Sequence, residues 1–232
     1  QMVMGWDVDG VIAISFSKSN CEKIYQLINK PIVSIDAYGE LDAGQESHVL
    51  NIGLDDESGG YLMTKYLLEC GYEHIQVCAG RDNGVDHLRY MGAQKAAKEF
   101  AEKQQKVQFT ALGMNYAKRK ESYAWLIQRK KPKTALFFLS DLYALEAISF
   151  FSSRGVKIPE EIGIAGYDNI SYAEFSVPRL TTVSQNVEQK ASLAVEILME
   201  RINGEDKERE NEIRLPVTLI SRKSVQRQDE KK

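Results

Sequence analysis

Residues 134–169 read TALFFLSDLYALEAISFFSSRGVKIPEEIGIAGYDN. The run at 134–139 is almost entirely apolar, which is typical of a strand buried on both faces of a sheet. An apolar run of helical length follows at 142–153 and ends before Gly155, a residue type suited to helix C-termini. A second short apolar strand is predicted over 162–165. A strand, a helix and another strand in this order predict a parallel β-α-β unit.

The same alternation of strand and helix patterns extends through the rest of the chain. We predict further strands over residues 8–14, 32–36, 49–53, 75–79 and 107–112, and further helices over 19–29, 61–70, 85–103 and 118–130. After Asp168 the pattern changes to an extended segment, a helix over 187–203, a final strand over 213–220 and a polar tail. The repeated order predicts an α/β fold whose parallel sheets carry helices on both faces.

The size and charge of the chain limit what it can do. Its 232 residues suffice for one large α/β unit or two small lobes. It carries 30 Lys and Arg against 33 Asp and Glu, a formal net charge of −3. A domain that grips DNA by itself usually has a basic excess that neutralises phosphates. We therefore do not expect these residues to hold nucleic acid.

Other patterns that identify enzymes, metal sites or secreted proteins are absent from the sequence. The three cysteines (Cys21, Cys70 and Cys78) form no CxxC pair, and we expect buried free thiols in a reducing cytoplasm. No apolar run is long enough to span a membrane. Phosphate-binding glycine loops, a nucleophile–base pair and clustered histidines are also missing, so we predict no cofactor, no metal and no catalysis.

Polar side chains stand where several predicted strands end. Asp36, the Ser140-Asp141 pair and Asp168 all follow apolar strands, and ligands of such sheets bind at the carboxyl ends of strands. Arg89 lies near the start of a helix, where a cation is unfavourable without a partner. Either it is a surface arginine or its guanidinium holds ligand hydroxyls; likewise Asp168 is either a turn residue or a ligand acceptor. The neighbouring carboxylates Asp55-Asp56 are typical of a helix N-cap.

Several of these segments together resemble the effector-binding core of the LacI/GalR family of bacterial repressors. The strongest run extends from Gly155 through Gly-Tyr-Asp-Asn at 166–169 to Pro-Arg-Leu-Thr-Thr-Val at 178–183. Further landmarks are Val-Asp-Gly-Val-Ile at 8–12, Pro-Ile-Val-Ser-Ile-Asp at 31–36, Asp-Asp-Glu-Ser-Gly at 55–59, Arg-Tyr-Met-Gly at 89–92, Pro-Lys-Thr-Ala-Leu-Phe at 132–137, Ser-Asp-Leu-Tyr-Ala-Leu at 140–145, Leu-Pro at 215–216 and Ser-Arg-Lys-Ser at 221–224.

The resemblance implies a fold like that of periplasmic binding proteins: two doubly wound parallel-sheet lobes, three crossovers and an effector cleft between the lobes. Residues 1–71 and 186–212 would form an N-lobe that lacks its opening β-α-β-α run. Residues 72–185 and 213–224 would form the C-lobe, and 225–232 a tail. Operator DNA would be contacted only through a helix-turn-helix head that is absent from this sequence.

Matched residue by residue, the family pattern assigns an effector site. Arg89 matches the arginine that holds effector hydroxyls, and Asp168 matches the carboxylate opposite it. Ser140 stands where many members have Asn, and Gln185 matches a cleft residue at a crossover.

The resemblance extends the same site to four further residues. Ser58 lies where some sugar-sensing members place an acidic contact, and Ser15 and Phe16 would line the N-lobe wall. Tyr116 (or Met114 beside it) would supply an apolar plate for a sugar ring.

The resemblance also implies a homodimer and a regulatory function. Leu142 and Leu145 on one helix, with Phe175 in the segment 173–177, would form the dimer face. A sugar or sugar phosphate would then control DNA binding. Two alternatives stay open: a solute-binding protein of a sugar transporter, which a secretion leader would favour, and a regulator that senses a purine.

Overall fold

The computed structural model describes residues 8–44, 46–82, 84–100, 106–205 and 207–228. The chain forms two compact units. Unit 1 comprises residues up to Asp55 together with Asn186–Pro216, and unit 2 comprises Asp56–Gln185 with the residues from Val217 onward. The chain therefore passes between the units three times, and both units have parallel sheets, as the fold class predicted from the sequence requires.

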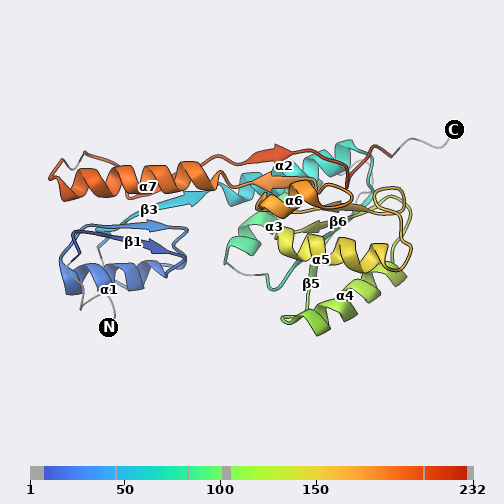
Figure 1. Cartoon of the computed structure of the whole chain (residues 1–232), viewed down its shortest axis with the longest axis horizontal. Helices are drawn as coiled ribbons and strands as arrows, with labels where there is room; N and C mark the ends of the chain where they lie inside the picture. The colour runs from blue at the N-terminus through green and yellow to red at the C-terminus, as the bar shows by residue number, and fades with distance from the viewer. Residues whose placement is uncertain (1–7, 45, 83, 101–105, 206, 229–232) are drawn as a thin grey trace. The chain divides into compact units, whose positions relative to one another are not determined.

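Unit 1 is built on a four-stranded parallel sheet with two helices. The strand order is β1 (Val11–Ile14), β2 (Ile32–Ile35), β3 (Leu50–Leu54) and β9 (Glu212–Leu215). The helices α1 (Lys18–Ile28) and α7 (Val187–Ile202) cover opposite faces of this sheet (Figure 1). Ala13, Cys21, Ile32 and Val49 form a buried cluster between α1 and the strands. Because both faces of the sheet are covered, every residue of β2 and β3 is buried, including the polar Ser34 and Asn51.

Unit 2 has a second parallel sheet and a short antiparallel pair. The parallel order is β5 (Lys106–Ala111), β4 (His74–Ala79), β6 (Thr134–Phe138) and β7 (Gly163–Ala165). The antiparallel pair consists of β8 (Thr182–Ser184) and β10 (Thr218–Ile220). Single bridges from Ala165 to Thr181 and from Asp168 to Ser184 place the β8 segment alongside the chain that leaves β7.

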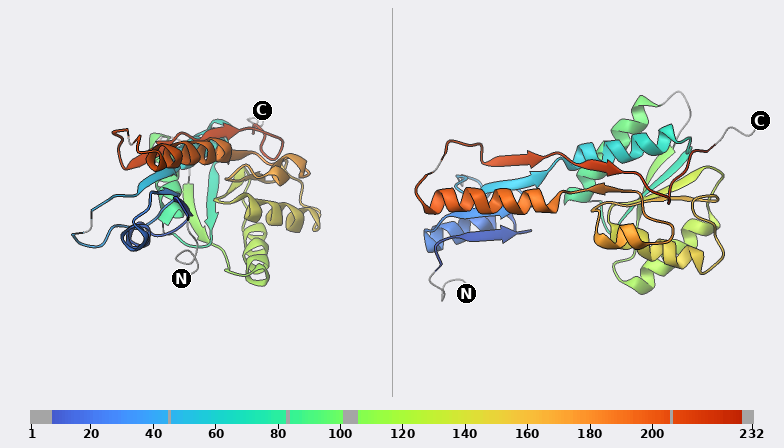
Figure 2. Two further views of the ribbon diagram at one scale, coloured as in Figure 1. Left: turned by 60° about the vertical axis from the view of Figure 1, so that its left-hand side comes forward. Right: turned by 45° about the horizontal axis from the view of Figure 1, so that its top comes forward.

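Five helices accompany the sheets of unit 2 within the described residues. They are α2 (Asp56–Glu69), α3 (Gly84–Glu99), α4 (Tyr116–Gln128), α5 (Asp141–Ser152) and the short α6 (Ser171–Phe175). The pair α2 and α3 covers one face of the parallel sheet, and α4 with α5 covers the other (Figures 1 and 2). This is the doubly wound arrangement that the sequence predicts.

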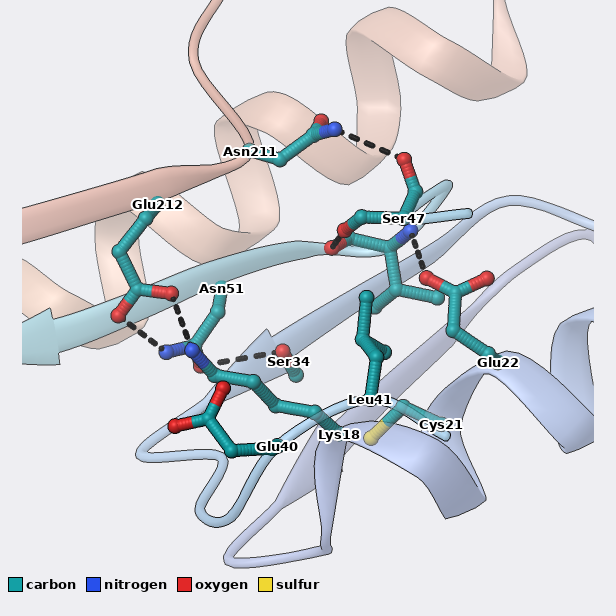
Figure 3. A pocket seen from close by; sticks show the side chains of 11 residues that line it. Lys18, Cys21, Glu22, Ser34, Glu40, Leu41, Ser47, Asn51, Asn211 and Glu212 are labelled. Atoms are coloured by element: carbon teal, nitrogen blue, oxygen red, sulfur yellow. Dashed lines mark hydrogen bonds and ion pairs between the residues drawn. The ribbon is translucent and has the colours of Figure 1, made fainter. Parts of the chain in front are cut away.

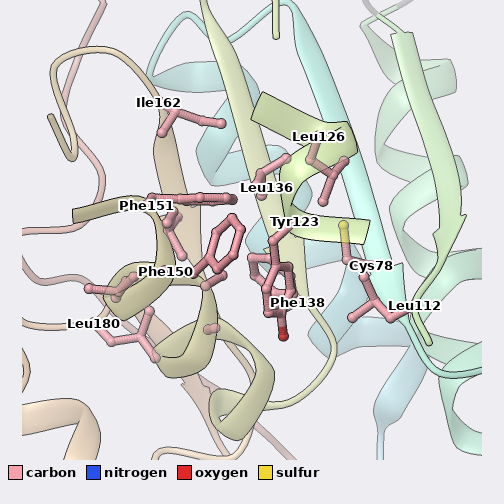
Figure 4. Close-up of a cluster of buried hydrophobic side chains, with 14 of the residues drawn as sticks. Cys78, Leu112, Tyr123, Leu126, Leu136, Phe138, Phe150, Phe151, Ile162 and Leu180 are labelled. Atoms are coloured by element: carbon pink, nitrogen blue, oxygen red, sulfur yellow. The ribbon is translucent and has the colours of Figure 1, made fainter. Parts of the chain in front are cut away.

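The core between α4, α5 and the sheet is rich in aromatic rings. Tyr123 is fully buried and packs edge-on against Phe138 and Phe151, with ring centroids 6.0 and 6.1 Å apart (Figure 4). Its hydroxyl donates to the carboxylate of Glu146 at 3.0 Å, which satisfies the polar end of the ring. The dense packing fixes α5, whose first turn follows Ser140 at the end of β6.

Helices α2 and α3 approach each other closely because glycines stand at their contact. A Cβ atom on Gly60 would lie 1.8 Å from the Arg89 carbonyl oxygen, and one on Gly92 would lie 1.9 Å from the Glu57 carbonyl oxygen. The backbones can touch only where no side chain intervenes. Residues 56–71, which we assigned to the N-lobe from the sequence, therefore belong to unit 2.

The predicted final strand over 213–220 is wrong as a single strand. It is split into β9, which pairs with β3 in unit 1, and β10, which pairs with β8 in unit 2. Pro216 stands between them; it has no N–H to donate to a ladder. Residues 213–216 consequently lie in unit 1 and not in the C-lobe to which we assigned them.

The tail predicted over 225–232 is also wrong where it is described. Val225 is buried, and the backbone N–H of Gln228 donates to the Cys70 carbonyl at 2.7 Å. The preceding Ser224 has its hydroxyl on the Ile164 carbonyl, which anchors this segment beside β7. Residues 229–232 lie outside the described part of the chain, as do 1–7 of the predicted N-lobe and 101–103 of the predicted helix over 85–103.

Candidate functional site

The carboxyl ends of β6, β7 and β8 meet at one edge of unit 2. The backbone N–H of Asp141 donates to the Tyr167 carbonyl at 2.7 Å, and that of Asp168 donates to the Val183 carbonyl at 2.9 Å. These bonds bring Ser140, Asp168 and Gln185 together although they lie far apart in the sequence. The edge is the place where ligands of such sheets bind.

Arg89, from the second turn of α3, contributes a buried guanidinium to this edge. The residue is only 7% exposed. Its Nε donates to Asp56 at 2.8 Å and its Nη1 donates to the Leu139 carbonyl at 2.8 Å. A guanidinium has five N–H donors, and no other described residue lies within hydrogen-bond distance of the remaining ones. Arg89 is therefore fixed in place and still has donors available for a ligand.

Two residues that sequence reasoning missed hold this arginine. The ring of Tyr167 lies under the guanidinium, with 3.7 Å from Cζ to the ring centroid, and its hydroxyl donates to Asp56 at 3.3 Å. Burial opposes the charge, but the nearby Asp56 carboxylate raises the pKa of Arg89 overall. Asp56 was interpreted as a helix cap from the sequence, and Tyr167 was only part of a family landmark.

Asp168 is held in the same neighbourhood by the side chains predicted to accompany it. Its Oδ2 accepts from the Ser140 hydroxyl at 3.0 Å, and its Oδ1 accepts from Gln185 Nε2 at 2.5 Å. The backbone of Asp168 has a φ of +123°, a conformation that L residues rarely adopt. Burial raises the pKa of Asp168, and the charge of Arg89 opposes that rise. Four of the predicted site residues thus come together: Arg89, Ser140, Asp168 and Gln185.

Asp141 sits behind this group as a fully buried carboxyl. It accepts hydrogen bonds from the Thr182 hydroxyl at 2.6 Å and from the Ile170 N–H at 3.0 Å. Burial raises the pKa of Asp141 to about 7, against the lowering effect of these two donors. Gly166 makes room for it, because a Cβ there would lie 2.1 Å from Asp141 Oδ1. Asp141 therefore ties together the loops that carry Ser140 and Asp168.

A third carboxylate, Asp86, stands one turn before Arg89 on α3. Its Oδ1 lies 4.0 Å from Arg89 Nη1, and its side chain is 27% exposed. Burial raises the pKa of Asp86 to about 6, with Arg89 lowering it and Asp168 and Asp56 raising it. Sequence reasoning missed Asp86, because an acidic residue in the first turn of a helix is ordinary.

Two predicted site residues of unit 2 are not joined to this group. Ser58 lines a separate hollow on the outside of α2 and α3, with Tyr61 and Lys95. Tyr116 begins α4, is 48% exposed and has the Lys120 ammonium 5.1 Å from its ring centroid. The part of Ser58 and Tyr116 in effector binding stays a prediction.

The predicted residues Ser15 and Phe16 belong to unit 1. They follow β1 at the carboxyl edge of that sheet, with Ser15 at a φ of +56° and Phe16 45% exposed. Asp36 ends β2 at the same edge and accepts from the Lys190 ammonium at 2.6 Å. Their part in effector binding stays a prediction.

Unit 1 also contains a polar hollow of about 320 Å³ beside α1 and β3 (Figure 3). Its polar groups are paired with one another: Lys18 Nζ with Glu212 at 2.9 Å, Asn51 Nδ2 with Glu212 at 3.0 Å, and the Ser34 hydroxyl with Asn51 at 3.1 Å. These bonds stabilise the contact between β3 and β9 and leave no reason to assign a ligand there.

The described part of the chain has no candidate membrane span and no candidate metal cluster. None of its helices combines the length and apolar character needed to cross a membrane. In the same residues, no group of three or more His, Cys, Asp and Glu side chains is placed to hold a metal ion. Cys21, Cys70 and Cys78 are buried and unpaired by disulfides, which confirms the prediction for the three thiols.

Sequence comparison identifies the family. Residues 64–225 match the model of the periplasmic binding protein-like domain. The chain is 36% identical over 177 residues to the HTH-type transcriptional repressor PurR of Haemophilus influenzae, a match covering 74% of this chain and 53% of that protein. The chain belongs to the periplasmic binding protein-like domain family and is an effector-binding core of the LacI/GalR type. It spans about half the length of the curated repressors that it matches first.

Solved structures agree with this assignment. A LacI family transcriptional regulator from Enterococcus faecium with bound ribose superimposes with a TM-score of 0.82 at 25% identity, covering 98% of this chain and 83% of that one. A periplasmic binding protein/LacI transcriptional regulator from Alkaliphilus metalliredigens, complexed with D-xylulofuranose, gives 0.79 at 27% identity, with coverages of 97% and 80%.

Proposed function

We propose that this chain is the effector-sensing and dimerisation core of a LacI/GalR-type transcriptional repressor. It binds a small molecule, a sugar or sugar phosphate, and thereby changes the affinity of the complete protein for operator DNA. Only an effector that binds one state of the repressor more tightly than another can do this. The proposal assigns binding, and not chemical turnover, to the residues around Arg89.

One observation carries the proposal: a buried guanidinium with unused donors stands at the ligand-binding edge of a doubly wound unit, near a carboxylate. Asp56 and Tyr167 fix Arg89, and Ser140 and Gln185 fix Asp168. Fixed donors and acceptors suit a molecule with several hydroxyl groups, because little side-chain freedom is lost on binding. The sugars bound by the two related structures support this class of ligand.

A purine effector is the second candidate. It is favoured by the likeness to the repressor PurR of Haemophilus influenzae, at 36% identity. A guanidinium and a carboxylate can pair with the edge of a purine base as well as with sugar hydroxyls.

Homodimerisation is supported by an apolar patch on unit 2. Leu142 at the start of α5 is 54% exposed, and Tyr172, Phe175 and Val177 around α6 are 74%, 77% and 86% exposed. Leu145, one turn further along α5, is half-buried against the core. Contiguous exposed apolar side chains of this size usually mark an interface.

The proposed effector site is tested by a thermal-shift screen of sugars, sugar phosphates and purines. A ligand at 100 times its Kd stabilises the folded state by about 2.7 kcal/mol, which is a measurable rise in Tm. We expect Arg89→Lys to remove the shift, because a lysine cannot reproduce the fork of donors, and the exposed control Arg129→Lys to keep it. A ligand that raises the Tm of Arg89→Lys as much as it raises that of the wild type would show that Arg89 does not contact the effector.

The link to DNA is tested with the complete repressor. Fluorescence anisotropy of its operator should change when the screened effector is added, and Arg89→Lys should abolish that response. An effector that binds without any effect on operator affinity would contradict a regulatory function and favour a solute-binding one.

A further inference from the structure

The candidate site contains more negative than positive charge. Arg89 is directly paired with Asp56, since Nε and Oδ1 are 2.8 Å apart and both side chains are only 8% exposed. Within the described residues, the Asp168 carboxylate accepts hydrogen bonds from uncharged groups: the Ser140 hydroxyl, the Gln185 amide and the Asp141 backbone. Asp86 also lies near the guanidinium, but at 4.0 Å it is beyond hydrogen-bond distance. One cation is therefore surrounded by three carboxylates.

Asp86 is three-quarters buried and accepts no hydrogen bond from any residue within the described ranges. A mostly buried carboxylate without a donor is costly, and such a group is satisfied when a donor arrives. Arg89 has unused donors, because this 7% exposed guanidinium retains N–H groups that have no acceptor among the described residues. The two unsatisfied groups stand side by side at the edge where ligands bind.

The distance of 4.0 Å between Arg89 Nη1 and Asp86 Oδ1 is long enough for one ligand group to bond both side chains. A hydroxyl group can accept from the guanidinium and donate to the carboxylate at the same time, at ordinary distances to both. A doubly ionised phosphate group, the main form above its second pKa of about 6, can only accept, so it would satisfy Arg89 and repel Asp86. Asp168 adds a second carboxylate that repels anions.

We propose that Asp86, together with Asp168, makes this site selective for an uncharged ligand with several O–H or N–H donors and excludes phosphorylated ligands. This inference rests on the proposed function of the same site and narrows its effector class. Sugar hydroxyls and the N–H groups of a nucleoside share this chemistry.

Isothermal titration calorimetry with matched ligand pairs tests the proposal. The probes are ribose and ribose 5-phosphate, glucose and glucose 6-phosphate, fructose and fructose 6-phosphate, and adenosine and AMP, each added to the full chain. We expect binding by an uncharged member and at least about tenfold weaker binding by its phosphate. The pairs also separate a sugar from a nucleoside ligand.

Asp86→Asn isolates the contribution of the carboxylate. We expect it to bind the uncharged ligand about tenfold more weakly, because a charge-assisted hydrogen bond is lost, and to bind the phosphate more tightly than the wild type does. Glu73→Gln removes one charge at the opposite end of β4, where Glu73 pairs with Lys133, and should change neither affinity. Unliganded Tm values show whether each variant folds.

The outcomes separate this inference from the function on which it rests. A phosphate that binds more tightly than its free counterpart would overturn the selectivity and leave an effector-binding function intact. Equal discrimination in Asp86→Asn and the wild type would remove Asp86 from the site. Failure of every probe to bind would contradict the proposed function itself, and the inference with it.

Discussion

At the scale of single residues, Arg89 both stabilises unit 2 and equips it for binding. Removal of one partner from a buried ion pair leaves the other charge uncompensated, which typically costs about 3–5 kcal/mol. We therefore expect Arg89→Ala to lower the free energy of unfolding by that amount in urea titrations, because the buried Asp56 would lose its cation and keep only the Tyr167 hydroxyl. The control Arg129→Ala, which loses an exposed contact with the Trp125 ring, should change it by less than about 1 kcal/mol.

A double-mutant cycle checks the cause of this loss. If the Arg89–Asp56 pair is responsible, Arg89→Ala combined with Asp56→Ala should be less destabilising than the sum of the two single variants. Strict additivity would show that the two side chains act independently and would contradict the assignment.

How far the site could be predicted from the sequence also depends on single residues. The structure brings Arg89, Asp168, Ser140 and Gln185 close together, because strand ends in a parallel sheet converge, and the family pattern supplied their identities; their part in effector binding stays a prediction. The pairing of Arg89 with Asp56 was not predicted, because Asp56 lies 33 positions away and looks like an ordinary helix cap in the sequence. Only tertiary packing turns that cap into the partner of a buried cation.

At the scale of elements, the contact between α2 and α3 positions Arg89 and depends on glycine. A Cβ on Gly92 would lie 1.9 Å from the Glu57 carbonyl oxygen, so α3 would have to move away from α2. Glycine to alanine in a helix normally gains about 1 kcal/mol. We expect Gly92→Ala to lose at least about 2 kcal/mol of unfolding free energy instead, as overpacking does.

Gly53→Ala is a suitable control because the nearest atom to its added Cβ is 3.6 Å away, an ordinary contact. It should change the unfolding free energy by less than about 1 kcal/mol in the same urea titrations. If Gly92→Ala were as stable as the wild type, close helix contact would not explain the position of Arg89.

The positions of the helices and strands were mostly predictable from the sequence. The sheet or unit that each of them joins was harder to predict. Apolar periodicity locates α5 and β6 within a residue or two. Periodicity does not report which sheet a strand joins, so the split at Pro216 and the transfer of α2 to unit 2 were missed. Both depend on contacts between segments far apart in the chain, where the local pattern carries no information.

At the scale of the whole molecule, buried carboxyls give stability an unusual dependence on pH. Burial raises the pKa of Asp141 to about 7, well above the usual 3.8, so the folded state holds a proton that the unfolded state releases. The stabilisation is complete below the unfolded pKa and is lost as pH rises through the folded one. We expect the free energy of unfolding to fall between about pH 5 and pH 7.

Asp141→Asn should reduce this slope, because asparagine does not titrate, and Asp86 and Asp168, whose pKa values burial also raises, should keep a smaller remainder of it. The exposed Asp9→Asn should leave the slope unchanged. Urea titrations at several pH values measure the difference between the variants. A wild-type slope that persists in Asp141→Asn would assign the effect to other groups.

The assembly of two chains depends on the apolar patch around α5 and α6. Phe175 is 77% exposed in the single chain, and a buried aromatic at an interface commonly contributes about 2 kcal/mol or more. We expect the wild type to sediment at twice the mass of one chain in analytical ultracentrifugation. Phe175→Glu and Leu142→Glu should each weaken dimerisation about 30-fold or more, because an unpaired carboxylate would be buried at the contact.

Leu27→Glu tests whether the patch is specific, since Leu27 is 65% exposed on α1 in unit 1 and lies outside the patch. Dimers that persist in both patch variants and dissociate in Leu27→Glu would place the interface elsewhere.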